Sequence, residues 1–127
     1  MFADLDHSFP KSRRLILSGE FRQVREHGIA QHSKLLVLSV LSPAPDHSLR
    51  IGLITSKRVG SAVERNKMRR RLREIFRLHQ HLLTPNIWIV TVVRHSAKLV
   101  TYQRLESDWL QLARRASIVC ADPSSPS

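Results

Sequence analysis

One segment of the chain holds most of its positive charge: Ser56-Lys57-Arg58-Val59-Gly60-Ser61-Ala62-Val63-Glu64-Arg65-Asn66-Lys67-Met68-Arg69-Arg70-Arg71-Leu72-Arg73-Glu74-Ile75-Phe76-Arg77. Nine of these residues are Lys or Arg and two are Glu, so the segment carries a net charge of +7, against +11 for all 127 residues. The positive charge of this protein is therefore concentrated in one element.

That segment has the pattern of a helix with a defined start. Ser61 followed three residues later by Glu64 is a capping box, in which each side chain accepts a backbone N–H of the other residue. Gly60 allows a sharp turn just before it. Apolar side chains then recur at helical spacing as far as residue 83, and Thr84-Pro85 ends the pattern. We predict a helix over residues 61–83, with an apolar stripe on one side and cations on the opposite side and flanks.

The composition indicates a nucleic-acid partner. A pI near 11.4 favours binding to a polyanion, with nucleic acid ahead of an anionic membrane surface. The single cysteine, Cys120, excludes an internal disulfide and fits a reducing compartment. The apolar runs are too short to cross a bilayer, and the N-terminal residues lack the pattern of a secretory signal. We expect a cytoplasmic protein without a membrane partner.

The remaining chain alternates short apolar runs with helical patterns. A helix is expected with Ser18 as its cap, ending near His27, with Gly28 as its C-terminal stop. Three strands and a last helix are expected over residues 35–41, 49–54, 87–93 and 102–116. This order fits an α+β fold, a two-layer α/β sandwich with helices on one side of a single sheet.

The domain organisation follows from the two chain ends, which lack periodicity. We expect a flexible arm over residues 1–14, a single RNA-binding domain over residues 15–117, and a disordered tail, rich in Pro and Ser, over residues 118–127.

The basic helix is the strongest candidate site. Most charge runs are solvated helix faces, but such faces intersperse both signs. Here four arginines fall within the five positions 69–73, where they repel one another without a polyanion nearby. We favour phosphate binding.

Other candidates are weaker. Phe21 beside Arg22 and Arg25 could stack an unpaired base, although the local sequence favours Phe21 as a core residue. Trp88 and Trp109 are also best interpreted as core residues. The seven histidines have no metal-ligand spacing, and no nucleophile, phosphate loop or carboxylate pair is evident. We therefore predict no catalytic residue and no metal bound by the protein.

The basic segment resembles the signature of the bacterial ribonuclease P protein subunit family. That signature has a strand ending in Ser-Lys-Lys, a Gly-x-Ala-Val turn, then Arg-Asn-Arg and further basic residues. The matching residues here are Ser56-Lys57-Arg58, Gly60-Ser61-Ala62-Val63, Arg65-Asn66-Lys67, Arg69 and Arg70. The resemblance extends over roughly residues 14–116 and includes Phe21 with Gly28, Arg50-Ile51-Gly52-Leu53, and the apolar run 87–93.

The resemblance implies a fold and a division of labour. The sheet would be mostly antiparallel, with the basic helix in a left-handed βαβ crossover, against the usual right-handed rule. The RNA subunit would use Mg²⁺ to cleave precursor tRNA, while one protein per RNA would bind that RNA and the 5′ leader of the substrate. By position, RNA contacts would come from Lys57, Arg58, Arg65, Asn66, Lys67, Arg69, Arg70 and Arg73. The leader cleft would be lined by Phe21, Arg25 and Arg73.

This chain departs from the family pattern at three positions. Lys67 keeps the charge of an arginine but lacks its bidentate fork. The positions of Arg25 and Ser39 are often aromatic in the family, so stacking on the leader is expected to be weaker. Arg25 could compensate by stacking its guanidinium or by holding a phosphate.

We therefore interpret the chain as the protein subunit of ribonuclease P, part of an endoribonuclease whose catalyst is RNA. The alternative is a small basic ribosomal or general RNA-binding protein without a role in processing. A DNA-binding module is less favoured, because no recognition-helix turn or dimer interface is evident.

Overall fold

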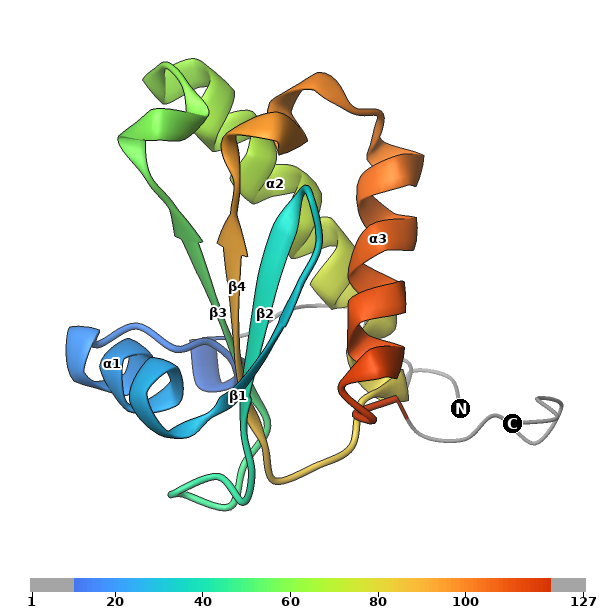
Figure 1. Ribbon diagram of the computed structural model, residues 1–127. Helices are drawn as coiled ribbons and strands as arrows, with labels where there is room; N and C mark the ends of the chain where they lie inside the picture. The colour runs from blue at the N-terminus through green and yellow to red at the C-terminus, as the bar shows by residue number, and fades with distance from the viewer. Residues whose placement is uncertain (1–10, 120–127) are drawn as a thin grey trace, which may run out of the picture.

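The computed structural model describes residues 11–119, which form one four-stranded sheet with helices on both of its faces (Figure 1). The helices and strands, in chain order, are α1 (Ser18–His27), β1 (Ile29–His32), β2 (Leu36–Leu41), β3 (Arg50–Thr55), α2 (Ala62–His79), β4 (Trp88–Val93) and α3 (Tyr102–Arg115).

The strands lie in the order β1-β2-β4-β3. β2 pairs antiparallel with both β1 and β4, whereas β3 pairs parallel with β4, and α2 connects these two parallel strands. The predicted α+β class, the mostly antiparallel sheet and the crossover through the basic helix are confirmed. β1 was not among the three predicted strands, because its four residues are largely exposed and carry no apolar pattern.

The larger core lies between the sheet and the helices α2 and α3. Trp109 of α3 is fully buried there, with its ring centroid 5.5 Å from that of Phe76 of α2. Its indole Nε1 donates a hydrogen bond of 3.0 Å to Oγ1 of Thr91 on β4. The predicted assignment of Trp109 to the core is confirmed, and it fixes α3 against the middle of the sheet.

The opposite face of the sheet is covered by α1, so the prediction that helices lie on one side only is wrong. Val24 of α1 is fully buried in a second core with Trp88 and Val90 of β4. Five of the six residues of β4 are buried. A nearly continuous apolar strand is typical of one that is covered on both faces, and this run required a second layer of helix.

Two glycines allow α1 to approach the sheet closely. A Cβ atom at Gly52 of β3 would lie 2.5 Å from Cε1 of Phe21, and one at Gly28 would lie 2.7 Å from the carbonyl oxygen of Val40. Neither distance is possible for a real side chain. The aromatic ring of α1 therefore rests directly on the backbone of β3.

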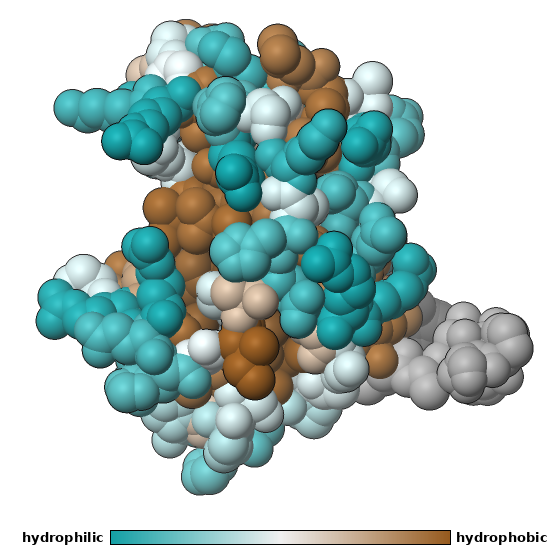
Figure 2. All heavy atoms as spheres, in the orientation of Figure 1, coloured by the Kyte–Doolittle hydropathy of each residue, from teal (hydrophilic) through white to brown (hydrophobic). Residues whose placement is uncertain are grey.

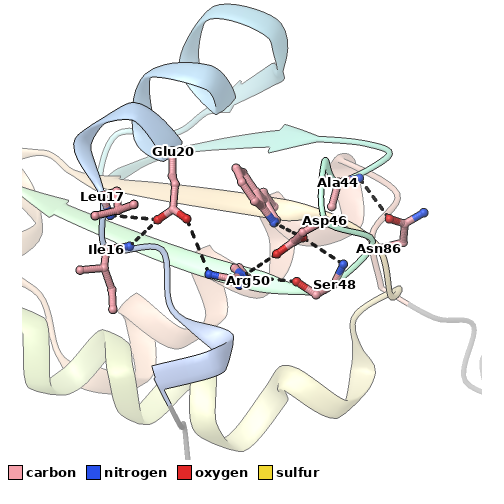
Figure 3. Close-up of polar contacts among 9 residues, drawn as sticks. Ile16, Leu17, Glu20, Ala44, Asp46, Ser48, Arg50 and Asn86 are labelled. Carbon is pink, nitrogen blue, oxygen red and sulfur yellow. Dashed lines mark hydrogen bonds and ion pairs between the residues drawn. The ribbon is translucent and has the colours of Figure 1, made fainter.

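The start of α1 differs from the prediction. Ser18 is not the cap: the helix begins at Ser18, and Leu17 precedes it without a side-chain cap. The carboxylate of Glu20 instead accepts hydrogen bonds of 2.9 Å from the backbone N–H groups of Ile16 and Leu17 (Figure 3). A glutamate in the first turn thus satisfies N–H groups that a capping serine would otherwise serve.

A chain of polar contacts continues from Glu20 into the sheet (Figure 3). Arg50 at the start of β3 lies 3.6 Å from Glu20 and 2.8 Å from Asp46 in the preceding loop. Asp46 also accepts hydrogen bonds from the indole of Trp88, at 2.8 Å, and from the backbone of Ser48, at 3.1 Å. These contacts connect α1 with β3, β4 and the loop between β2 and β3.

The predicted start of α2 is confirmed. Ser61 Oγ accepts a hydrogen bond of 3.2 Å from the backbone N–H of Glu64, whose carboxylate accepts one of 2.9 Å from the N–H of Ser61. Gly60 has φ 144° and ψ −157°, a conformation almost restricted to glycine. The helix itself ends at His79, and a 3-10 turn continues it to Leu82.

Regular structure extends past both predicted domain boundaries. Of the expected N-terminal arm, Lys11–Arg13 form a 3-10 turn and Arg14 pairs with Ile51. Of the expected tail, Ile118 is only 3% exposed and Val119 pairs with Leu83. Residues 1–10 and 120–127, which make up the rest of both segments, lie outside the described residues. Within residues 11–119, no helix is long and apolar enough to cross a membrane.

Replacing Gly60 with alanine is expected to lower the free energy of unfolding by about 1–3 kcal/mol. A Cβ atom there would lie 2.3 Å from the carboxylate of Glu64 and would break the capping box. Urea unfolding followed by circular dichroism measures the loss. Gly19→Ala is the matched control, because a Cβ atom there has no neighbour within 4 Å. If both variants are equally stable, the cap does not constrain α2.

Asp46→Asn is expected to destabilise the protein at pH 7 by less than about 1 kcal/mol. Partial burial opposes ionisation, but hydrogen bonds from Ser48 and Trp88 and the charge of Arg50 outweigh it and lower the pKa of Asp46. A lowered pKa gives stability that is present above the unfolded-state pKa and lost as the pH falls through the folded-state pKa. The difference between variant and wild type should therefore shrink below about pH 4, as measured by urea unfolding. A difference that is constant from pH 7 to pH 3 would exclude this charge interaction.

Candidate nucleic-acid interface

The exposed side of α2 carries a shallow basic groove. Its volume is about 500 Å³, and it is lined by Val63, Asn66, Arg69, Arg70 and Arg73. These positions recur at helical spacing on the side opposite the buried residues Met68, Leu72, Ile75 and Phe76. The sequence pattern that buries one side of α2 therefore presents its cations together on the other.

The two carboxylates of α2 do not neutralise this groove. Glu64 serves the helix cap, where the N–H of Ser61 and the charge of Lys98, 4.0 Å away, lower its pKa. Glu74 forms an ion pair with Arg77, whose hydrogen bond lowers the pKa of Glu74. Both carboxylates are thus held ionised by contacts outside the groove.

Some cations of α2 have structural partners and others do not. Arg71 donates a hydrogen bond of 3.1 Å to the carbonyl of Val100, and Arg69 donates one of 3.3 Å to the side-chain oxygen of Asn66. Within residues 11–119, no hydrogen bond or ion pair is made by the side chains of Arg65, Lys67, Arg70 and Arg73. The contact with Arg69 orients Asn66 so that its amide N–H groups are available to a ligand.

Arg73 lies where positive charges converge. Partial burial of its guanidinium, together with the charges of Arg14 and Arg69, lowers the pKa of Arg73. The lowered pKa reports a local excess of positive charge that the protein itself does not balance. An anion in the groove would relieve this repulsion, which is what a phosphate-binding surface requires.

The structure distributes the other predicted RNA-binding residues around this groove. Arg65 precedes Arg69 and Arg73 at four-residue spacing, so all three lie on one side of α2. Lys67 lies on the opposite flank, near Glu64. Lys57 and Arg58 are exposed in the 3-10 turn Lys57–Val59, between β3 and α2.

The predicted leader cleft is divided between two surfaces. Phe21 and Arg25 line a second groove, of about 540 Å³, along α1, together with Ser18, Arg22 and Glu26. Arg73 lines the α2 groove instead, on the helix that covers the other face of the sheet. Figure 2 shows a hollow with an apolar floor between α1 and the tip that carries the turn 57–59. Ile54 and Val92, both partly buried, belong to the same face as Phe21.

Sequence reasoning missed two residues of these surfaces. Val63 lines the α2 groove with 76% of its surface exposed, and its place opposite the apolar stripe was the available signal. Arg14 was assigned to a flexible arm, yet its pairing with Ile51 brings it close enough to Arg73 to influence the pKa. No local pattern indicates that contact, because it joins segments 59 residues apart.

The described residues show no metal-binding cluster. Within residues 11–119, no three His, Cys, Asp or Glu side chains are grouped to hold a metal ion. His79 lies 2.7 Å from Glu106 and connects α2 with α3.

Comparisons with known proteins agree with these features. The sequence model of the family described as Ribonuclease P matches residues 9–117. The ribonuclease P protein component of Clostridioides difficile is 33% identical over 111 residues, covering 87% of this chain and 96% of that protein. The corresponding protein of Chloroflexus aurantiacus is 37% identical over 112 residues, covering 87% of this chain and 82% of that protein.

Solved structures share the fold. The RNase P protein of Staphylococcus aureus superposes with a TM-score of 0.78 at 23% identity, covering 86% of this chain and 99% of that one. The RNase P protein of Thermotoga maritima gives a TM-score of 0.72 at 24% identity, covering 80% of this chain and 96% of that one. With the family match across most of the sequence and the basic crossover helix in place, this chain belongs to the bacterial ribonuclease P protein family.

Proposed function

We propose that the exposed side of α2 binds the RNA subunit of ribonuclease P and that this contact supports 5′ maturation of tRNA. Family membership makes the protein an RNA-binding component of that enzyme. The observation that carries the assignment to α2 is the groove with Arg69, Arg70 and Arg73, whose charge no carboxylate balances. Asn66 adds amide donors in the same groove. Phosphate contacts from such a surface give RNA affinity without base specificity.

In this proposal the chemistry belongs to the RNA subunit and the Mg²⁺ that it binds. The protein supplies positive charge where two polyanions, the catalytic RNA and precursor tRNA, must approach each other. Its cations reduce their mutual repulsion, which would otherwise have to be screened by divalent ions. The protein is then required most at low Mg²⁺ concentration. One protein would act per RNA, in the cytoplasm.

The 5′ leader of precursor tRNA is assigned to the groove along α1. Phe21 offers a ring and Arg25 a guanidinium there, a combination suited to unpaired nucleotides. The leader and the catalytic RNA would therefore contact different helices, on opposite faces of the sheet.

The combined variant Arg65→Gln, Asn66→Ala, Arg70→Gln is expected to lose stimulation of precursor-tRNA cleavage at low Mg²⁺. Removing two phosphate contacts should also reduce the slope of log affinity for the RNA subunit against log salt by about 2. Cleavage assays with a bacterial ribonuclease P RNA, and filter binding from 50 to 400 mM salt (roughly the range in which such contacts are lost), measure the two effects.

Arg114→Gln on α3 is the matched control, since it removes one exposed arginine from a helix that carries neither groove. Full stimulation by the triple variant would exclude α2 as the RNA-binding surface. Tight RNA binding by the wild type without any stimulation of cleavage would favour a general RNA-binding protein instead.

A further inference from the structure

Three neighbouring side chains on α1 combine one ring with two cations. Phe21, Arg22 and Arg25 line the groove of about 540 Å³, with Ser18 and Glu26 at its margin. Residues three or four apart on a helix are neighbours, with about 5–6 Å between their Cβ atoms. Arg25 therefore lies beside both Phe21 and Arg22. This trio is called the α1 trio below.

The ring of Phe21 is held in place from beneath. It lies on the backbone of β3 at Gly52, where any side chain would collide with it. The other aromatic side chains within residues 11–119 do not compete for a ligand here. Phe76, Trp88 and Trp109 are buried, and Tyr102 packs against the core on the other face of the sheet. The groove thus offers one aromatic surface, enough for one base.

The two arginines of the trio are available for a ligand. Arg22 and Arg25 are exposed, and neither makes a hydrogen bond or ion pair within the part of the chain that the structure describes. Glu26 is the one acidic residue lining the groove, so two guanidiniums face a single carboxylate. Glu20 lies on another side of α1, where it binds the N–H groups of Ile16 and Leu17 and faces Arg50.

The sheet beside α1 offers little with which to identify a base. Ile54 and Val92, which face this side, are apolar. Ser39, paired between Ala30 and Val90, is only 7% exposed. Recognition of base identity needs donors and acceptors aimed at base edges. Guanidiniums and a ring contact phosphates and the face of any base instead.

We propose that the α1 trio binds single-stranded RNA through its backbone, with Arg22 and Arg25 each holding a phosphate and Phe21 stacking one base. Affinity then depends on the presence of the strand and on salt, and little on its base sequence. The proposal rests on the proposed function, which makes the 5′ leader of precursor tRNA the ligand. It assigns to Arg22 a role in leader binding and defines how the leader is recognised.

The test compares holoenzymes reconstituted with wild type, Arg22→Gln, Arg25→Gln or Phe21→Leu. The ligands are precursor tRNAs with leaders of oligo-A, oligo-U or oligo-C, and the same tRNA without a leader. Each arginine variant should lose severalfold in its preference for a leader, equally for all three sequences. Each should also reduce the salt slope of leader-dependent binding by about 0.7. Phe21→Leu should weaken all three leaders without changing that slope.

Arg104→Gln is the matched control, because it removes an exposed arginine from α3, on the other face of the sheet. The proposal is overturned if Arg22→Gln and Arg25→Gln both behave like Arg104→Gln. It is also overturned if wild-type affinities for the three leaders differ by more than about tenfold, beyond the modest preferences expected of stacking. Failure of the proposed function looks different, because the wild type would then stimulate no cleavage at all. Thermal melting of each variant confirms that it is folded.

Discussion

The parallel pairing of β3 with β4 constrains the rest of this molecule. Parallel neighbours cannot be joined by a tight turn, so the chain has to leave the sheet and return to the same end of it. α2 is that connection. Its length, its cap and its apolar stripe are needed to cross back over the sheet. The cations that the sequence places between the apolar positions are consequently fixed on a rigid element and turned towards solvent.

The features of α2 were predictable because they depend on neighbours in the sequence. Ser61 and Glu64 interact across one helical turn, and the apolar stripe is a matter of spacing. Their positions in the structure follow the pattern closely. The two tryptophans were assigned correctly for a similar reason, since large apolar side chains within apolar runs are seldom exposed.

What could not be predicted depends on contacts between distant segments. The placement of α1 on its own face follows from the burial of β4 on both sides, which the run 87–93 indicated but did not assign to a helix. The role of Gly52 is visible only once Phe21 lies above it. Arg73 was grouped with Phe21 in one cleft, yet their helices cover opposite faces. The count of basic residues in α2 also overstates the binding surface, because Arg71 and Arg77 are engaged within the protein.

The capping box has a consequence for the direction from which RNA approaches. Helix N-termini are common phosphate sites, because their free N–H groups and the helix dipole attract anions. Here Glu64 occupies that end of α2 with its own negative charge. A phosphate would meet a carboxylate there instead of free amides. The strand must therefore run along the side of the helix, where long flexible side chains reach it, and the backbone geometry of the terminus takes no part in recognition.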